Sequence, residues 1–513
     1  MIYIHNRSGD SRLEEIVSLS FIRAYTKSQV SLLKNIPVLN CVVVVINPVA
    51  EDYYLLNKIS FTFSKIILLG ELPPAIAKLI GLKIDKLPRG ASLWDECGSA
   101  PVNSFSQSRV LIEYLENLPF GLESPIKSRP LLRFDYSKEW NNLGYGHVTT
   151  DGTKWSVSCV AKPVSTESVS VASLYLDKDY LTSYIVLSGL NTSQVLWVNR
   201  SVGLVDTSEF RLIETFITNY LPEKSICLPL LREIPFGYDA MISMRLDCDE
   251  AIASSRELFE LYKAHNIPFS LAIKSGQPID KSDTELIEDV VKSGGAVLSH
   301  SVNHKPNWGD SYQEVLNEAF GSRQEIIGLS KLIDSVDYAV SPFHKNSEYA
   351  VRALDELDYK GFIGGIICND PEFLISRAGV VMADLDIVSH SQQCMLHGDV
   401  LLSVIKQSVS NAVKGNIMFA YLDHPFSERY QYGWESEASR LEAHASLINY
   451  IKKINNVLFV NENELLDFVV MRSRLRLSID DGKVIINNIE AGISEYIPSI
   501  EYKSKIIAVS EKL

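Results

Sequence analysis

The sequence lacks the patterns of several protein classes. It contains only seven cysteines in 513 residues, at irregular spacings, so it does not encode the disulfide framework of a small secreted domain. No apolar run approaches the roughly 20 residues that a membrane-spanning helix needs. The first residues, MIYIHNR, lack the basic start and apolar core of a signal peptide. We therefore expect a cytoplasmic protein with reduced cysteines and no integral membrane segment.

Positive charge is also scarce. The chain has 49 lysines and arginines against 63 acidic residues, a net charge of -14. Because proteins bind the phosphate backbone through a basic face, we expect no nucleic-acid partner. The rest of the composition is ordinary for a globular protein, and 513 residues exceed one compact domain. Two or three domains are expected.

Two polar clusters in the middle of the chain follow apolar segments. Asp247 and Asp249 end the apolar run over 240–246, and His300 and His304 follow another such run. In a (β/α) barrel the loops after the strands converge on one cavity. Carboxylate oxygens and imidazole nitrogens bind divalent cations, and three such ligands leave positions for water and substrate. The pattern therefore favours a catalytic metal site over a structural one.

Two later motifs, Ser341-Pro342-Phe343 and Leu422-Asp423-His424, complete an ordered set. Together, D-x-D, H-S-x-x-H, S-P-F and L-D-H resemble the motifs of polysaccharide deacetylases with the NodB-homology domain, carbohydrate esterase family 4 and its relatives. The resemblance covers roughly residues 240–470, a little under half of the chain. Each motif alone is common by chance, whereas four in this order at strand ends form a specific pattern.

The resemblance implies a metal-dependent hydrolase that removes N-acetyl groups from an acetamido sugar or polysaccharide, a surface-glycan precursor for example. By position, Asp247 corresponds to the general base and His424 to the general acid. The metal ligands would be Asp249, His300 and His304, with zinc as the default divalent ion. The residues that we expect to bind the carbohydrate are Arg245, Pro342, Phe343, Tyr421 and Leu422.

One departure from the family keeps other functions open. The third motif commonly begins with an arginine that pairs with the catalytic aspartate, and this chain has Ser341 there. Arg245, two residues before Asp247 on the same side of a strand, can supply that charge instead. Without such a partner, the barrel would be a catalytically inactive carbohydrate-binding or scaffold protein. A third possible function is that of an O-acetyl esterase, because the same catalytic groups would hydrolyse an ester, which is cleaved more easily than an amide.

Other polar residues near the motifs receive weaker predictions. His344 follows the S-P-F motif and is expected to line the substrate groove. Asn369 and Asp370 end a predicted strand where the family often has an acidic residue. His390 and His397 lie in a stretch without a clear period, and we predict that they are surface residues.

The alternation of strands and helices predicts an α/β protein with a mostly parallel, closed or nearly closed sheet over residues 236–470. The family resemblance implies a distorted (β/α)7 barrel. Residues 1–125 are predicted as an α/β accessory domain, with buried strands over 38–46 and 65–70 and a helix over 106–118. Residues 126–235 are predicted as a mixed, β-rich accessory domain or as one unit with the first. Residues 471–513 are predicted as a β-hairpin tail that turns at Asp480-Asp481-Gly482.

Overall fold

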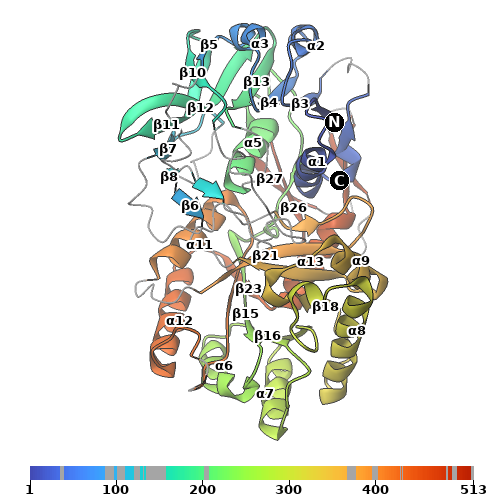
Figure 1. Cartoon of the computed structure of the whole chain (residues 1–513). Helices are drawn as coiled ribbons and strands as arrows, with labels where there is room; N and C mark the ends of the chain where they lie inside the picture. The colour runs from blue at the N-terminus through green and yellow to red at the C-terminus, as the bar shows by residue number, and fades with distance from the viewer. Residues whose placement is uncertain are drawn as a thin grey trace.

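The computed structural model describes residues 1–34, 40–86, 98–100, 110–120, 127–130, 132–134, 157–200, 207–366, 377–395, 402–427, 429, 431–480, 483–487 and 494–509. Two nine-stranded sheets dominate these ranges, one in each half of the chain. Figure 1 shows the N-terminal sheet above and the second sheet, with its helices, below. The predictions for Asn369, Asp370 and His397 lie outside the described residues. None of the described helices is both long enough and apolar enough to cross a membrane.

The N-terminal sheet is parallel on one side and antiparallel on the other. The strands of both predicted accessory ranges form this one sheet, while the predicted boundary between the ranges stays a prediction. Its order is β2 (Val30–Leu32), β1 (Ile2–Asn6), β3 (Val42–Ile46), β4 (Lys65–Leu69), β13 (Ser193–Val198), β12 (Asp179–Leu190), β11 (Ser168–Leu176), β7 (Val110–Tyr114) and β8 (Ser128–Pro130).

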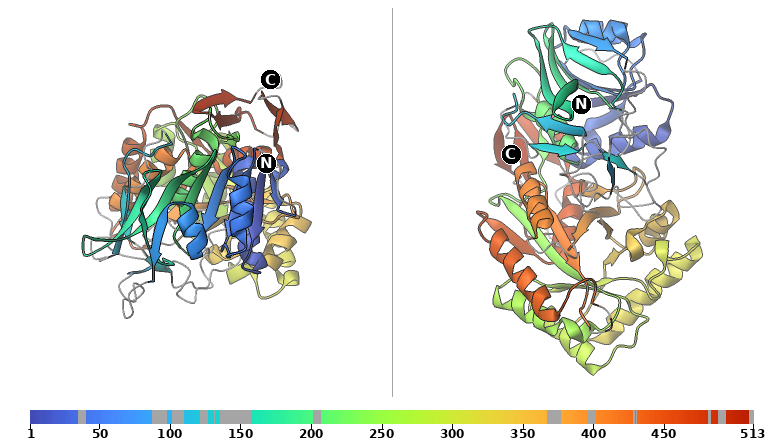
Figure 2. Two further views of the ribbon diagram at one scale, coloured as in Figure 1. Left: turned by 90° about the horizontal axis from the view of Figure 1, so that it is seen from above. Right: turned by 60° about the vertical axis from the view of Figure 1, so that its left-hand side comes forward.

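Helices cover both faces of the N-terminal sheet, which explains the unbroken apolar run in β3. Successive strand residues point to opposite faces. Val42 and Val44 pack in the core with α1 (Ser11–Tyr25) and α5 (Thr207–Asn219). Val43 and Val45 pack in a second core with α2 (Asp52–Ile59) and α3 (Pro74–Leu79). The left view of Figure 2 shows these strands and helices from above.

The predicted helix over 106–118 is wrong for residues 110–114, which form β7. Val110, Ile112 and Tyr114 are buried, whereas Glu113 between them is exposed. This alternation has the period of two that belongs to a strand. The sequence VLIEYLENL also matches a helical period, and pairing with β11 selects the strand.

The second sheet closes into a barrel of seven parallel strands, which confirms the predicted fold class. The ring is complete because β15 pairs with both β16 and β22. Its strands, in order around the barrel, are β15 (Ala240–Cys248), β16 (Ser270–Ile273), β17 (Ala296–Ser299), β18 (Tyr338–Val340), β19 (Gly361–Ile366), β21 (Val388–Cys394) and β22 (Phe419–Asp423).

Two features distort the barrel. The first half of β15 pairs with β23 (Val457–Val460), and only its second half pairs with β16. Between β17 and β18 a single residue pair, Ser299 with Ala339, forms the ladder. Nevertheless the carboxyl ends of β15, β17 and β22 lie at one end of the barrel, because all these strands run parallel.

Amphipathic helices surround the barrel strands. They are α6 (Arg256–Ala264), α7 (Lys281–Lys292), α8 (Tyr312–Leu329), α9 (Glu348–Glu356), α11 (Ser403–Gly415), α12 (Glu437–Ile451) and α13 (Glu462–Arg474). Local sequence signals start several of them. Asp280 and Asp283 form a capping box at α7, and Asn461 and Glu464 form another at α13.

The C-terminal segment ties the two halves together. β24 (Arg476–Asp480) and β25 (Lys483–Asn487) pair antiparallel at the residues where the sequence predicts a hairpin. Beyond them, β26 (Ser499–Tyr502) pairs with β27 (Lys505–Ala508) and with β14 (Leu230–Leu231), which precedes the barrel.

Buried ion pairs reinforce the junction between the two halves. Arg377 contacts Glu214 of α5 and donates to Glu233 at 3.0 Å. Arg211 of α5 contacts Glu501 of β26. All these side chains are almost fully buried, so the accessory sheet docks on the barrel through charges that water does not screen.

The described cysteines are buried, and none of them forms a disulfide. They are Cys41, Cys159, Cys227, Cys248 and Cys394. Cys248 lies between Asp247 and Asp249 but points to the opposite side of β15, where it packs in the core between the barrel and its helices.

Candidate metal centre

Three predicted ligands converge at the carboxyl end of the barrel. Asp249 is the first residue after β15, and His300 is the first residue after β17. The Nε2 atoms of His300 and His304 lie 3.4 and 3.3 Å from Oδ1 of Asp249, and 3.0 Å from each other. One donor atom from each residue therefore lies within 4.8 Å of the others, as in a single cation site.

The backbone fixes the orientation of the His300 ring. Its Nδ1 lies 2.9 Å from the carbonyl oxygen of Val340, the last residue of β18. A donated Nδ1–H leaves the lone pair on Nε2 free for a cation. The side chain of Asn303 donates to Glu318 at 2.6 Å, and Ser301 Oγ accepts from the backbone N–H of His304 at 2.8 Å.

The loop that carries His304 is held on two sides. The buried carboxylate of Glu318, from α8, accepts hydrogen bonds from the backbone N–H groups of Val302 and Asn303. On the other side Gly276 donates its N–H to the carbonyl of Val302 at 3.0 Å, and a Cβ at this glycine would lie 2.5 Å from that oxygen. His304 itself has a φ of 54°, a left-handed conformation that is costly for a residue with a side chain.

The three residues fit a divalent cation. Oδ1 of Asp249 is buried and has no hydrogen-bond donor, which is costly unless a positive charge faces it. Burial and the neighbouring His300 lower the pKa of His304 to about 4, so this imidazole is neutral at pH 7, as a ligand must be. A set of two imidazoles and one carboxylate suits zinc and other first-row ions.

The predicted base, Asp247, lies beside the triad and is paired with Arg245. Nε of Arg245 is 2.5 Å from Oδ1 of Asp247, and Nη2 is 3.0 Å from Oδ2. Burial by itself would raise the pKa of Asp247, but the guanidinium and the neighbouring His300 hold it well below its usual range. Asp247 is therefore ionised at neutral pH.

A buried polar chain continues inward from Arg245. Its Nη1 donates to Gln392 Oε1, and Gln392 Nε2 donates to Glu462 at 2.5 Å. Glu462 also accepts from Ser243 at 2.8 Å and lies 3.2 Å from Nε2 of His390. The prediction that His390 is a surface residue is wrong, since it is 2% exposed.

These residues belong to β21, whose sequence is VSHSQQC. All seven are buried, and two alternate positions, His390 and Gln392, reach Glu462. Five consecutive polar residues, 389–393, lie between Val388 and Cys394, so this strand shows no alternation of polar and apolar residues. Sequence reasoning missed it because a strand is normally recognised by its apolar residues.

His424, the predicted acid, follows the last residue of β22. Its ring stacks on Tyr432, with centroids 4.3 Å apart and planes 7° apart, and its Nδ1 is buried without a hydrogen-bond partner. The neighbouring Asp423 points elsewhere: it binds His444 Nε2 at 2.9 Å and Trp434 Nε1 at 3.1 Å. Tyr432 was not among the predicted site residues. Trp434 donates its indole N–H to Asp423.

Of the five residues predicted to bind the carbohydrate, two lie in the turn after β18 and three lie in the strands β15 and β22. Pro342 and Phe343 lie in the turn after β18, and the half-exposed Phe343 ring has its centroid 4.7 Å from that of His304. Leu422 is fully buried within β22. Tyr421 and Arg245 are buried as well, so none of these three side chains lies at the surface, and their role in binding carbohydrate stays a prediction.

Tyr421 and Arg245 contact other residues of the protein. Tyr421 points toward the surrounding helices, where its hydroxyl lies 2.7 Å from that of Tyr262. Arg245 is fully buried, and its guanidinium is occupied by Asp247 and Gln392. Arg245 therefore acts on the carboxylate beside it, as the alternative reading of its position predicted.

His344 is a further imidazole close to the centre. It is 7% exposed, and its ring has no hydrogen-bond partner within the described part of the chain. Burial lowers its pKa to about 3, and the charges that it senses are those of Asp247 and Arg245, then of His300 and His424. His344 and Phe343 both have positive φ angles, 57° and 53°, so this turn is strained next to the triad.

No protein-family profile matches the sequence, and no curated protein sequence does. Solved structures do match, over 44% to 49% of the chain. A putative polysaccharide deacetylase from Mycobacterium smegmatis is 11% identical, over 49% of this chain and 96% of that one, with a TM-score of 0.35. A family 4 acetyl xylan esterase from Clostridium thermocellum, in complex with a cobalt ion, is 14% identical over 44% and 89%, with a TM-score of 0.30.

A third match is a carbohydrate esterase family 4 pseudoenzyme from Bacillus anthracis. It is 16% identical, over 44% of this chain and 66% of that one, with a TM-score of 0.31. Two of these names place the proteins in carbohydrate esterase family 4, one as an acetyl xylan esterase and one as a pseudoenzyme. At identities of 11% to 16% and TM-scores of 0.30 to 0.35 these matches say nothing of the chemistry, which depends on the residues of this chain.

Proposed function

We propose that this chain is a metal-dependent hydrolase that removes the N-acetyl group from an acetamido sugar. The main support is the convergence of Asp249, His300 and His304 beside the ion pair of Asp247 with Arg245. Asp249, His300 and His304 would hold the ion. A divalent cation bound there would polarise the amide carbonyl and lower the pKa of water. Zinc is the default choice for this donor set.

Asp247 is suited to accept a proton from water. Its carboxylate stays ionised because Arg245 stabilises the negative charge, and the same pair fixes its orientation through two hydrogen bonds. A strongly stabilised carboxylate is a weak base, so the water must itself be acidified for the transfer to proceed.

His424 is suited to protonate the leaving amine. Its ring is held by stacking on Tyr432 rather than by a carboxylate, so both ring nitrogens are free of hydrogen bonds within the described residues. A positioned imidazole is the most frequent general acid in enzymes.

Arg245 argues against the reading of the barrel as an inactive binding protein. That reading depends on Ser341, which replaces an arginine of the family and here bonds to Asn346 at 2.6 Å. Since Arg245 pairs with Asp247 from the same strand, the carboxylate keeps a cationic partner. An O-acetyl esterase would use the same residues and remains the second candidate.

The decisive experiment measures acetate release from N-acetylated sugars and oligosaccharides, with O-acetylated sugars as a parallel series. Metal-loaded wild type is compared with Asp247→Asn, and bound metal is quantified in both. Release from N-acetylated substrates by wild type alone, with metal retained in both proteins, would support the proposal. Release from esters only would identify an esterase. Bound metal without any release would favour a binding protein, and absence of metal from both would contradict the ligand set.

A further inference from the structure

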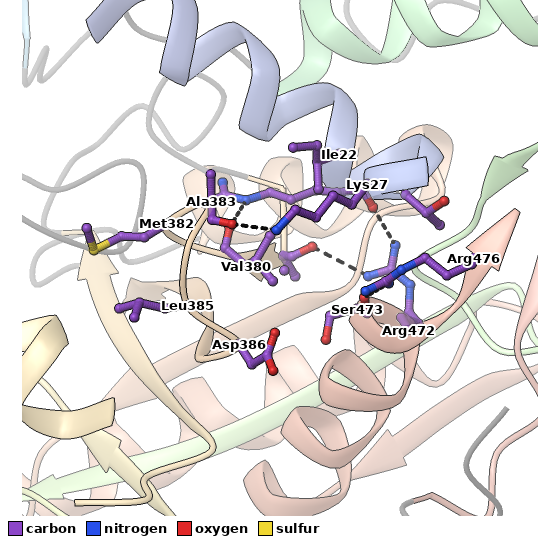
Figure 3. Close-up of a pocket in the computed structure, with 14 residues that line it drawn as sticks. Ile22, Lys27, Val380, Met382, Ala383, Leu385, Asp386, Arg472, Ser473 and Arg476 are labelled. Carbon is purple, nitrogen blue, oxygen red and sulfur yellow. Dashed lines mark hydrogen bonds between the residues drawn. The ribbon is translucent and has the colours of Figure 1, made fainter. Parts of the chain in front are cut away.

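Two hollows lie where the N-terminal half of the chain meets the rest. The hollow between the ends of α1 and α13 holds only about 50 Å³, and its cations donate to backbone carbonyl groups (Figure 3). The other hollow holds about 310 Å³, which is enough to admit small solutes. This second hollow leads to a buried pair of side chains, Lys65 and Cys227.

The second hollow lies between the accessory sheet and the C-terminal strands. Its wall contains the segment 222–227 after α5, Ile479 of β24, and residues 502–503 at the turn from β26 to β27. Asn40 and Phe63, which precede β3 and β4, also line it. Cys227 is the residue of this lining that carries a thiol, so small solutes in the hollow reach its sulfur.

The segment that carries Cys227 is anchored to neighbouring elements by its backbone. Ile226 donates its N–H to the carbonyl of Phe63 at 3.0 Å, and Leu228 donates its N–H to the carbonyl of Ile217 in α5 at 3.4 Å. Cys227, between these two contacts, is 3% exposed. The backbone therefore holds the thiol beside the beginning of β4.

Lys65, the first residue of β4, is fully buried next to that thiol. It lies on the same face of the strand as Ile67 and Leu69, which pack with α5. Its Nζ donates to Cys227 Sγ at 3.2 Å and to the carbonyl of Ile217 at 2.9 Å. In the described part of the chain no carboxylate forms an ion pair with Lys65. The sulfur atom is therefore the side-chain partner of this amine.

The surroundings of both groups favour reaction. An ammonium group that donates to sulfur stabilises the thiolate, which is the form that attacks oxidants. Burial lowers the pKa of Lys65 to about 8, and the neighbouring Cys227 opposes this shift. A part of the Lys65 population is therefore an uncharged amine near neutral pH. This part grows once oxidation removes negative charge from the sulfur.

Two other buried cysteines of the N-terminal half lack this combination. Cys41 has the hydroxyl of Ser64 as its neighbour, at 3.6 Å, and Cys159 has Asn199 Oδ1, also at 3.6 Å. Burial raises the pKa of both thiols, that of Cys159 to about 12. Neither residue lines the second hollow. Both cysteines therefore serve as controls within the same molecule.

We propose that Cys227 is an oxidation site for hydrogen peroxide and that Lys65 captures the oxidised sulfur. The thiolate first attacks one oxygen of the peroxide. The O–O bond breaks, an S–O bond forms and hydroxide leaves, so sulfur is oxidised to a sulfenic acid while the peroxide is reduced. The uncharged amine of Lys65 then attacks this sulfur. An S–N bond forms, the S–O bond breaks, and the oxygen leaves as water with a proton from the amine.

The product is a sulfenamide, the same class of bond that a sulfenic acid forms with a backbone nitrogen. Little movement is needed, because Nζ and Sγ already lie 3.2 Å apart and the lysine side chain is flexible. The bond links β4 to the segment that leads through β14 into the barrel. A thiol reverses it by attacking the sulfur, which releases the amine and leaves a mixed disulfide. A second thiol then restores Cys227.

The test treats the full chain with a small molar excess of hydrogen peroxide at neutral pH. The protein is then unfolded, its free thiols are alkylated, and its peptides are analysed by mass spectrometry. In wild type we expect a peptide pair linked through Lys65 and Cys227 and lighter than the two reduced peptides by two hydrogen atoms. Dithiothreitol should remove the link. Cys41 and Cys159 should remain free for alkylation.

Lys65→Gln tests the role of the amine, and Lys58→Gln, at an exposed position of α2, is its control. We expect oxidation of Cys227 to be at least about tenfold slower in Lys65→Gln than in Lys58→Gln, with no linked pair. Thermal denaturation verifies that both variants are folded. The comparison of Cys227 with Cys41 and Cys159 in wild type does not depend on either variant.

Three results would overturn the proposal. The first is oxidation of Cys227 that is no faster than that of Cys41 and Cys159. The second is rapid oxidation of Cys227 without a link to Lys65. The third is a linked pair that keeps the oxygen atom, because the condensation step releases that atom as water.

Discussion

Arg245 and Asp247 form an ion pair between alternate residues of one strand, with Nε 2.5 Å from Oδ1. Because alternate residues of a strand point to the same side, the pleat of β15 places the cation beside the carboxylate without help from a loop. Gln392 and Glu462 then hold the far side of the guanidinium. The pair of Arg245 and Asp247 is thus held by residues inside the barrel. The loop that carries His304 is held instead by Glu318 of α8.

The first prediction concerns this pair. Arg245→Gln should lower the free energy of unfolding by about 3 kcal/mol, because it leaves a buried carboxylate without its cation. It should also move the acidic limb of the kcat/KM profile to higher pH. Burial raises the pKa of Asp247 and Arg245 lowers it, so the pKa rises when the guanidinium is removed. Urea denaturation and pH-dependent rates measure the two effects.

Arg245→Lys is the matched control for that prediction. It keeps the positive charge and loses the two-point contact, so both effects should be smaller than in Arg245→Gln. An unchanged acidic limb in Arg245→Gln would mean that Arg245 does not set the pKa of Asp247.

A second prediction tests the ligands. Asp249→Ala and His304→Ala should each reduce bound metal to fewer than about 0.1 equivalents after dialysis, because two donors do not hold a divalent ion in competition with water. His265→Ala, on the exposed end of α6, is the control and should bind as wild type does. Elemental analysis measures the metal. Full occupancy in Asp249→Ala would show that the ion lies elsewhere.

The sequence indicated that these polar residues meet at one end of the barrel because they follow strands, whereas the choice of Asp249, His300 and His304 as ligands came from the family resemblance. Asp249 and His300 come immediately after apolar strands, and parallel strands bring their carboxyl ends together. The roles given to Asp247 and His424 come from the family resemblance and stay predictions. The buried run in β3 was predictable for a similar reason, since both of its faces are covered by helices.

The residues that hold Arg245 beside Asp247 could not be predicted in the same way. Gln392 of β21 and Glu462, the first residue of α13, are 70 residues apart and meet only because α13 packs against β21. The direction in which Tyr421 points could not be predicted, because both faces of β22 are buried and the sequence does not distinguish the face toward the helices from the face toward the barrel interior. The sequence of residues 110–114 matches both the helical and the strand period, and pairing with β11 selects the strand.

A third prediction concerns the junction between the two halves. Burial raises the pKa of Glu214 to about 7, although Arg377 and Arg211 lie beside it. A carboxyl group with a raised pKa favours the folded state below its unfolded pKa of about 4.5, and this contribution disappears as pH rises through about 7. Relative to Glu214→Gln, wild type should therefore lose up to about 3 kcal/mol of stability between pH 4.5 and 7.

Urea denaturation of wild type and Glu214→Gln at several pH values between 4.5 and 8 measures this difference. Glu116→Gln serves as the control, because Glu116 is exposed and pairs with Lys127 on the surface. A stability difference that stays constant with pH would show that Glu214 remains ionised throughout the range.

The last prediction concerns the stacking of Tyr432 on His424. The rings lie 4.3 Å apart and almost parallel, and within the described residues no hydrogen bond holds the imidazole. Tyr432→Ala should therefore leave His424 less well oriented and lower kcat about three- to tenfold, in line with the 0.5–1.5 kcal/mol of an aromatic pair. Bound metal should be unchanged, because Tyr432 does not contact the ligands. Tyr432→Phe, which keeps the ring and removes the hydroxyl, should retain most of the activity. If both variants lose activity equally, the hydroxyl rather than the stacked ring positions the acid. If neither does, His424 is oriented by the substrate itself.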